Sequence, residues 1–359
     1  MTTQNKKIRN LRWIATPVFA LITFLLTELA ARNPAFVERY YSRGIYPVIA
    51  SVFSFISSRV AFSLDDLFYG LLILLPLFLL LLAVLKRMSW KAAGKILLNS
   101  LAGIYIAFYF LWGFNYYRSD FNQRLGLAEQ RANTDAFVAV LDGLAEKLSA
   151  DWTGYENMKK EHIDSLVEES YKRIAPALKL QYPSGKRRAK NITAGMLFAQ
   201  AGISGYYGPF FNEVHVNPYN LPVEYPFVLA HEKAHQFGIT SEAEANFYAW
   251  LVCTQSSSKQ LRYSANLVIF RYFLFHGSRL EQIPGIAGKL DEKVKTDFRR
   301  IREHWVELRN EKIDRAASKV NDAYLKSNKV TGGIEDYTGV VKFVMDFSAD
   351  SAFQSKVEL

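Results

Sequence analysis

Three long apolar stretches in the first third of the chain constrain its fold more than any other feature. They cover residues 13–31, 67–85 and 96–114, and each approaches the length of about 20 residues that a helix needs to cross a bilayer. The second and third contain no charged residue, and the first contains only Glu28, close to its end. Because a lipid-exposed segment must satisfy its backbone hydrogen bonds internally, we expect all three to be transmembrane helices.

A fourth apolar stretch, residues 44–58, is shorter and is flanked by Arg43 and Arg59. It is short for a span, so we interpret it as an interfacial or re-entrant helix, with a membrane crossing as the alternative. The first span could instead be a cleaved signal peptide, but its apolar run is long for one. The N-terminal region, residues 1–116, is therefore expected to be a three-helix membrane anchor.

Lysine and arginine residues flanking the spans predict their orientation. Basic residues precede the first span and fill the loop between the second and third, namely Lys6, Lys7, Arg9, Arg12, Lys86, Arg87, Lys91 and Lys95. Loops rich in these residues face the cytoplasm, so we expect everything after Phe114 to lie outside. We therefore expect an integral membrane protein whose C-terminal domain, residues 117–359, lies outside the cytoplasm. A crossing by residues 44–58 would instead make that domain cytoplasmic.

The positive charge of the chain is concentrated in the anchor. Residues 1–116 hold 12 basic and 4 acidic residues, which is +8 of the chain's net charge of +10. The remainder, with 32 basic and 30 acidic residues, is nearly balanced. The high isoelectric point therefore reflects membrane topology, and nucleic acid is not an expected partner. The lone Cys253 excludes an internal disulfide.

The C-terminal region is long enough for one domain with a substantial core. Its hydrophobic periodicity predicts helices at residues 134–150, 156–180, 226–237, 241–256, 262–275, 290–327 (as one helix or two) and 337–347. Glycine, aromatic and β-branched residues at 202–219 predict one or two short strands. We expect a mainly α protein in which three transmembrane helices precede an α-rich α+β domain with a short strand region. Residues 262–275 are expected to form a core helix, with a fourth span as the weaker alternative.

A pair of histidines four residues apart, His231 and His235, lies in the helix predicted at 226–237. Residues at this spacing share one helix face, so both imidazoles can reach a single metal ion. Glu232 follows the first histidine, where its carboxylate can accept a proton from metal-bound water. Two histidines, a carboxylate and a water are typical of a catalytic zinc site, which leaves one coordination position open.

The following residues supply candidates for the carboxylate ligand. Gly238 can end the metal helix in a left-handed conformation, and Ser241 with Glu244 is a capping-box pattern that starts the next helix. Glu242 is then free to face back toward the histidines. Asn246, four residues further on, shares its face and could orient a ligand from the second shell.

These residues resemble a known class of enzyme. The H-E-x-x-H pattern with a downstream E-x-x-A-N at residues 242–246 resembles the gluzincin metallopeptidases. The resemblance implies that His231, His235 and Glu242 bind Zn²⁺ and that Glu232 is the general base. The gap before Glu242 is short for gluzincins and looks more like the H-E-x-x-H-x-x-G-x-x-H/D arrangement of metzincins and aspzincins. Their third-ligand position is Ser241 here, a poor ligand.

The layout of the whole chain also resembles an uncharacterised family of bacterial integral membrane proteins with a C-terminal zincin-type domain. This resemblance implies a bacterial inner-membrane protein whose C-terminal domain lies in the periplasm or outside. Several alternatives stay open at this point. Glu244 could replace Glu242 as the third ligand, and the two histidines could be ordinary polar residues of a helix. The site could also bind metal without catalysing a reaction.

The strand region before the metal helix suggests a substrate cleft. In zinc peptidases of this type, an edge strand beside the metal helix pairs with the backbone of the substrate. Tyr206 and Tyr207 could shape such a cleft, and a tyrosine or His215 could stabilise the oxyanion. Packing for stability is the alternative role of this strand.

The sequence therefore predicts a membrane-anchored, zinc-dependent metallopeptidase that hydrolyses peptide bonds through a metal-activated water. Its expected partners are the lipid bilayer and a peptide or protein substrate. The main alternative is a membrane scaffold, with or without metal, that binds an envelope protein without cleaving it. Hydrolysis of a non-peptide bond is a further alternative.

Overall fold

The computed structural model describes residues 3–129, 131, 133–182 and 187–357. The chain separates into two compact units. Unit 1 comprises residues 1–119 and 208–213, and unit 2 comprises residues 120–207 and 214–359. The described residues are mainly helical, with a short mixed sheet before helix α10 (Tyr225–Gln236), which confirms the predicted fold class.

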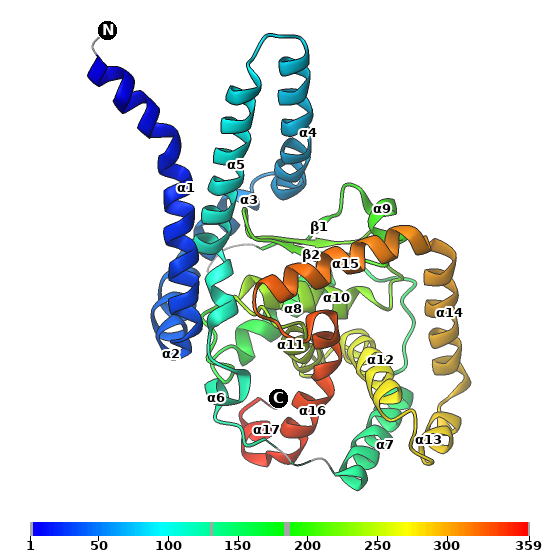
Figure 1. Cartoon of the computed structure of the whole chain (residues 1–359). Helices are drawn as coiled ribbons and strands as arrows, with labels where there is room; N and C mark the ends of the chain where they lie inside the picture. Colours follow the sequence, from blue (N-terminus) through cyan, green and yellow to red (C-terminus); the bar gives the residue numbers. More distant parts are fainter. Residues whose placement is uncertain (1–2, 130, 132, 183–186, 358–359) are drawn as a thin grey trace. The chain divides into compact units, whose positions relative to one another are not determined.

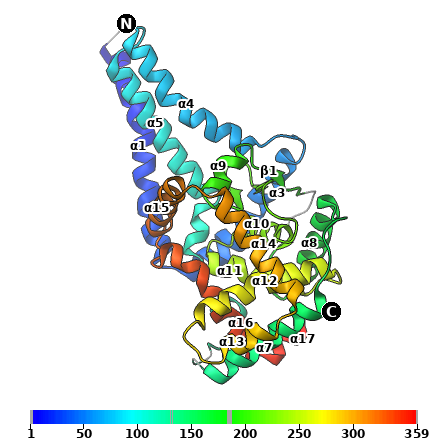
Figure 2. The ribbon, with the colours of Figure 1, turned by 90° about the vertical axis from the view of Figure 1, so that its right-hand side faces the viewer.

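Three helices of unit 1 are long and apolar enough to cross a membrane, as predicted. They are α1 (Thr3–Ala31), of which Trp13–Ala31 is the candidate span, α4 (Leu64–Val84) and α5 (Trp90–Leu111). Helix α1 packs along α5, and α4 pairs with α5, as Figures 1 and 2 show. Only 11% of each apolar window is buried within the protein. Such extensive exposed apolar surface suits lipid better than water.

Capping residues explain why α4 and α5 begin before the apolar stretches that predicted them. The hydroxyl of Ser63 accepts a hydrogen bond from the Asp66 amide at 2.8 Å. The hydroxyl of Ser89 accepts one from the Ala92 amide at 3.2 Å. Each serine hydroxyl accepts an amide hydrogen of the first helical turn that has no partner within the helix. Each helix can therefore begin at polar residues ahead of its apolar stretch.

The segment predicted as an interfacial helix is helical. Residues 44–57 fall on the end of a π-helix, η1 (Val37–Ile45), and on α3 (Tyr46–Ser57). Unit 1 also contains α2 (Pro34–Phe36), before η1, and a 3₁₀ turn, η2 (Gly113–Tyr117), after α5. None of these described helices is among the three candidate spans. Their interfacial position remains a prediction.

Residues 208–213 group with unit 1 through reciprocal hydrogen bonds to the start of α4. The Glu213 carboxylate accepts the Asp65 amide and the Ser63 hydroxyl, both at 3.1 Å. In return, the Asp65 carboxylate accepts the Phe211 amide at 3.3 Å. The Asn212 amide donates to the Ala50 carbonyl at 2.8 Å. Each of these buried carboxylates thus caps backbone amides in the other segment.

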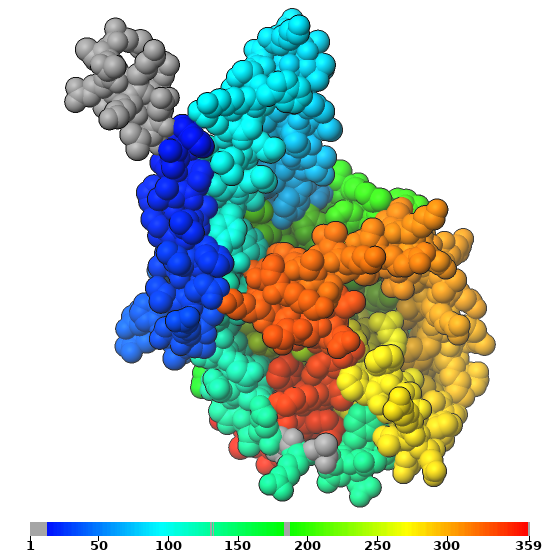
Figure 3. All heavy atoms as spheres, viewed as in Figure 1, coloured from blue at the N-terminus to red at the C-terminus, as the bar shows by residue number. Residues whose placement is uncertain are grey.

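Unit 2 is built from helices around one hydrophobic core. In chain order these are α6 (Phe121–Leu125), α7 (Thr134–Asp151), α8 (Lys160–Ile174), α9 (Gly195–Gln200), α10 (Tyr225–Gln236), α11 (Glu242–Thr254), α12 (Lys259–His276), α13 (Ile283–Lys289), α14 (Glu292–Leu308), α15 (Glu311–Ser327), the 3₁₀ helix η3 (Gly333–Gly339), α16 (Val340–Ala349) and α17 (Ser351–Val357). Helix α12 packs in the core, as predicted, and is not among the candidate spans. Helices α14 and α15 cover one face of this unit (Figure 3).

The helix predicted at 156–180 was too long at both ends. Helix α8 ends at Ile174: Ala175 still has helical dihedral angles, but Pro176 has no amide hydrogen with which to continue the helical hydrogen bonds. At the other end, residues before Lys160 form a turn in which the Met158 amide bonds to the Tyr155 carbonyl at 3.1 Å.

The sheet has three short strands in the order β1-β3-β2. Strands β2 (Gly205–Gly208) and β3 (Glu213–Val216) confirm the predicted strand region. Strand β1 (Lys190–Asn191) was not predicted, and it pairs in parallel with β3 so that Lys190 lies opposite His215. Because β3 is central, β2 is an edge strand of this sheet.

Candidate metal centre

Helices α10 and α11 form an antiparallel pair that carries the candidate metal ligands. Gly238 has φ of +74°, the left-handed conformation predicted for the end of the metal helix. The chain therefore reverses within a few residues, and α11 returns along α10, its most extensive helical neighbour. This turn brings Glu242, in the first turn of α11, back to His231 and His235 at the end of α10.

The side chains of His231, His235 and Glu242 converge on one point. The Nε2 atoms of the two histidines lie 3.3 Å apart. The Oε2 atom of Glu242 lies 3.1 Å from Nε2 of His231 and 3.6 Å from Nε2 of His235. All three side chains are largely buried, with exposed fractions of 7–12%.

These three distances match the spacing of ligands around a tetrahedral metal ion. Zinc bonds to nitrogen and carboxylate oxygen are about 2.0–2.2 Å long, which separates neighbouring ligand atoms of a tetrahedron by about 3.3–3.6 Å, close to the 3.1–3.6 Å found here. Two imidazoles and one carboxylate are also the ligand types that zinc takes in sites with an open position. His231, His235 and Glu242 therefore have the spacing and the ligand chemistry to hold a zinc ion.

The pKa values of His235 and Glu242 are each shifted by the charge of the other residue. Burial lowers the pKa of His235, but the Glu242 carboxylate more than compensates and raises it to about 9. Burial raises the pKa of Glu242, but the two histidines outweigh this and hold it well below its usual range. The carboxylate is therefore ionised, as a metal ligand must be.

Glu232 lies beside this cluster and is also buried. Its carboxylate falls within 4.8 Å of ligand atoms of His231 and His235, and these three residues form a candidate metal-binding group. Burial raises the pKa of Glu232 to about 7, and Glu242 adds to the rise while the histidines oppose it. A Cβ atom at Gly205, on edge strand β2, would lie 2.7 Å from the Glu232 carboxylate. The glycine leaves the room that this carboxylate occupies.

Glu244, the alternative third ligand, lies away from the histidines. Its carboxylate forms an ion pair with the buried guanidinium of Arg124. The hydroxyl of Ser241 accepts the Glu244 amide at 3.3 Å, so the predicted cap of α11 is present. In a complete capping box the Glu244 carboxylate would also accept the Ser241 amide. Here the carboxylate pairs with Arg124 instead, a charged hydrogen-bond donor.

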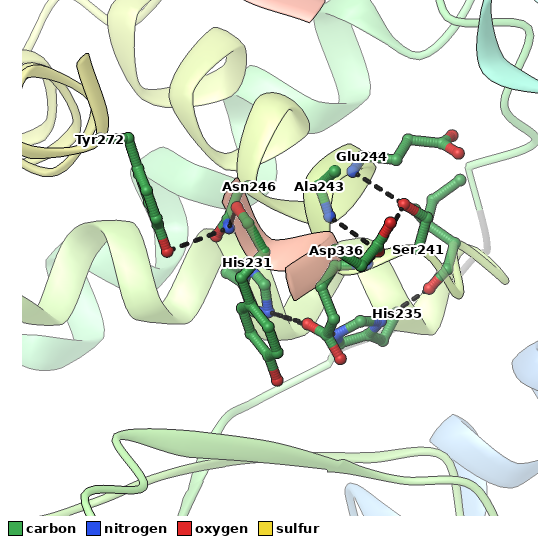
Figure 4. A network of polar contacts seen from close by, with 11 residues as sticks. His231, His235, Ser241, Ala243, Glu244, Asn246, Tyr272 and Asp336 are labelled. Atoms are coloured by element: carbon green, nitrogen blue, oxygen red, sulfur yellow. Dashed lines mark hydrogen bonds and ion pairs between the residues drawn. The ribbon is translucent and has the colours of Figure 1, made fainter. Parts of the chain in front are cut away.

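A carboxylate from a distant part of the chain also caps α11. Asp336, in η3, accepts hydrogen bonds from the Glu242 amide at 2.7 Å, the Ala243 amide at 3.3 Å and the Ser241 hydroxyl at 2.9 Å. Figure 4 shows its carboxylate directed at this first helical turn. Sequence analysis did not identify Asp336, because it lies more than 90 residues beyond the motif.

Asn246 is held among aromatic side chains. Its amide donates to the Tyr272 hydroxyl at 3.3 Å (Figure 4). It also donates to the Tyr337 carbonyl oxygen at 3.1 Å. The Tyr337 ring lies parallel to the His231 ring, with centroids 6.5 Å apart. Asn246 thus contacts Tyr337, which in turn lies beside His231. The sequence pattern gave no indication of Tyr337.

The three residues predicted for a substrate cleft occupy different positions. Tyr207 lies toward the metal cluster, with its ring centroid 6.3 Å from that of His235. His215 is fully buried in β3 and stacks on Tyr206 at 4.2 Å. The Tyr206 and His215 rings thus pack against each other, whereas the Tyr207 ring lies near that of His235. The role of the three residues in a substrate cleft stays a prediction.

A buried ionic network supports the far face of α10. The Lys233 ammonium is fully buried and lies 2.6 Å from both Asp164 and Glu168 of α8. The Arg187 guanidinium bonds to the same Glu168 at 2.5 Å, and its carbonyl accepts from Lys233 at 2.7 Å. Lys233 occupies a variable position of the H-E-x-x-H pattern, so the pattern predicts no role for this residue.

The fold and the site define a helical protein with three candidate membrane spans and a buried His/Glu group in H-E-x-x-H spacing. The chain belongs to a protein family described as "Protein of unknown function (DUF3810)", whose sequence profile matches residues 41–345. The match includes the three candidate ligands, Glu232 and η3. Neither a curated protein nor a solved structure matches the chain.

Proposed function

We propose that this protein is a membrane-anchored zinc metallopeptidase. The observation that carries the proposal is the convergence of His231, His235 and Glu242 at 3.1–3.6 Å, with Glu232 beside them. A purely structural zinc site uses four protein ligands, whereas three leave a position for water. Zinc in this position supplies a polarised water and a Lewis acid for a carbonyl oxygen.

Glu232 is the general base of the proposed reaction. It takes a proton from the attacking water and then returns it to the leaving amine. Its carboxylate lies beside the two histidines, where it can accept a proton from a water held at the open coordination position. The open space at Gly205 lets this carboxylate lie against the backbone of β2.

Edge strand β2 is the proposed binding site for the substrate backbone. An extended peptide that adds to this edge forms main-chain hydrogen bonds independent of its side chains. Gly205 of β2 lies next to Glu232, and Tyr207 of the same strand lies toward His235. A peptide paired with β2 would therefore run past both the general base and the ligand cluster.

The catalytic unit is proposed to face the periplasm or cell exterior, on the basis of the basic residues flanking the spans. A cysteine at exposed Ser278 of unit 2 tests this, because the native Cys253 is fully buried. Ser278→Cys in intact cells stripped of their outer membrane should react with an impermeant thiol reagent, whereas Lys91→Cys should react only after lysis. The reverse pattern would place the unit in the cytoplasm.

The activity is tested with the full chain, purified in detergent and loaded with zinc. A mixture of peptides of diverse sequence is incubated with the protein, and new termini are identified by mass spectrometry. Cleavage that disappears on chelation and returns with added zinc supports the proposal. A zinc-loaded protein that cleaves no peptide, but retains a partner from the cell envelope, would support the scaffold alternative instead.

A further inference from the structure

The 3₁₀ helix η3 (Gly333–Gly339) makes several contacts with the metal-binding helix pair, although it follows the H-E-x-x-H motif by about 100 residues. Asp336 binds the start of α11, and Tyr337 contacts both α10 and α11. Neither residue belongs to the ligand set or to the proton-transfer machinery.

We propose that η3 is a positioning element for the metal centre, with Asp336 as the residue that fixes the third ligand, Glu242. This inference rests on the metal-binding part of the proposed function and not on hydrolysis. It assigns Asp336 the task of holding the first turn of α11 in place, so that the Glu242 carboxylate reaches the two imidazoles.

The hydrogen bonds of Asp336 support this role directly. One carboxylate oxygen accepts the amides of Glu242 and Ala243 and the hydroxyl of Ser241. The bond to the Glu242 amide, at 2.7 Å, is at the short end of the range for a charged acceptor and acts on the backbone of the ligand itself. Ser241 alone satisfies the Glu244 amide, so without Asp336 the amides of Glu242 and Ala243 would lose this acceptor.

Tyr337 contacts the site from the next position in η3. Its ring lies parallel to His231, its carbonyl accepts the Asn246 amide, and its buried phenol interacts with the Glu242 carboxylate. One short segment thus contacts a histidine ligand, the carboxylate ligand and the residue one helical turn beyond it. Outer contacts of this kind orient metal ligands, and their loss typically lowers metal affinity by about 10–100-fold.

Helix α15 anchors η3 at its start. The Asp322 carboxylate of α15 accepts the Ile334 amide at 3.3 Å. Gly333 has φ of +54°, and a Cβ atom there would lie 2.0 Å from an Asp322 oxygen. A glycine is therefore required where the chain turns from α15 toward the metal centre.

The test compares two helix caps of the same chemistry in the full chain. Asp336→Ala removes a carboxylate from the start of α11, and Asp350→Ala removes one that accepts the Phe353 amide of α17 at 2.8 Å. Zinc affinity is measured by competition with a chromophoric chelator, and thermal stability is measured on the metal-free proteins. We expect Asp336→Ala to weaken zinc binding by about 10–100-fold, and Asp350→Ala to leave it within about twofold while also lowering stability. Asp336→Asn, which retains one carbonyl acceptor, should recover part of the affinity.

Equal zinc affinity in Asp336→Ala and the wild type would overturn the inference, as would an equal loss in both cap variants. If Asp336→Ala does not fold, Tyr337→Phe provides the comparison, because it removes only the hydroxyl. Weaker zinc binding in Tyr337→Phe supports positioning of the ligand. Unchanged zinc affinity with a lower turnover number would overturn the inference and would indicate that the Tyr337 phenol contacts the reacting atoms. A wild type that binds zinc but cleaves no peptide contradicts the peptidase proposal while leaving the affinity comparison intact.

Discussion

The Nδ1 atom of His235 lies 2.6 Å from the backbone carbonyl oxygen of Ile239, four residues further along the chain. This bond makes Nδ1 the donor, which leaves Nε2 directed at Glu242 and His231. Ile239 follows Gly238, so the same left-handed turn that reverses the chain also orients the second histidine. The short gap before Glu242, unusual for the gluzincins that the motif resembles, is therefore accommodated by this turn.

The Glu232→Gln variant tests the assignment of the general base. Glutamine has nearly the same shape but cannot accept the proton, so we expect hydrolysis to fall by about 10²–10⁴-fold. Zinc content, measured by elemental analysis, should stay at the wild-type level because Glu232 is not in the ligand set. Retained turnover in this variant would rule out the proposed role of Glu232.

Glu242→Ala and Glu244→Ala separate the two acidic residues at the start of α11. Loss of Glu242 removes a ligand, so zinc affinity should fall sharply. Loss of Glu244 leaves the Arg124 guanidinium buried without its ion-pair partner, a defect that typically costs about 3–5 kcal/mol of stability. Chelator competition and thermal unfolding of both variants distinguish these effects. Equal loss of zinc affinity in the two would contradict the choice of Glu242.

The buried network behind α10 predicts a dependence of stability on acid pH. Burial raises the pKa of Glu168, but Lys233 and Arg187 outweigh this and hold it at about 2. A folded-state pKa below the unfolded value of about 4.5 stabilises the protein above pH 4.5. That contribution, on the order of 3 kcal/mol, should be lost as the pH falls from about 4.5 to about 2. Unfolding followed across this pH range by circular dichroism measures it.

Lys233→Met tests the same network at neutral pH. The variant leaves Asp164 and Glu168 without their buried ammonium, so we expect a destabilisation of about 3–5 kcal/mol. The control is Lys289→Met, which removes an ion pair with Asp142 that is largely exposed and worth at most about 1 kcal/mol. Equal effects of the two substitutions on the unfolding temperature would contradict the structural role of Lys233.

Gly205→Ala tests the contact between edge strand β2 and the general base. The added methyl group would lie 2.7 Å from the Glu232 carboxylate and 2.9 Å from the His215 carbonyl oxygen. Because the second contact is with backbone, the strand must shift, at about 1–3 kcal/mol. We expect lower turnover with unchanged zinc content. The control is Gly143→Ala on α7, where a Cβ atom meets nothing within 4 Å.

Local patterns in the sequence predicted most of the elements and the immediate neighbourhood of the motif. Hydrophobic runs predicted the three candidate spans, and the Gly238 and Ser241 signals predicted how α10 ends and α11 begins. Such features depend on residues within a few positions of one another. At α8, hydrophobic periodicity alone predicted a helix that continues past Pro176, whereas the helix ends at Ile174.

The residues that sequence analysis missed are those brought to the site by tertiary packing. Asp336 and Tyr337 lie about 100 residues beyond the motif, and Arg124 lies about 120 residues before its partner Glu244. Strand β1, with two residues, is too short for any periodicity to reveal. A single sequence contains no signal that links such distant positions, so only the structure could identify them.

The central claim is that His231, His235 and Glu242 bind one zinc ion, and metal content tests it most directly. The full chain and its His231→Ala variant are purified in detergent, supplied with zinc, and measured by elemental analysis. The account predicts about one zinc per wild-type chain and a loss of that zinc in the variant. A folded wild-type protein that takes up no zinc, or a variant that retains it, would contradict the account.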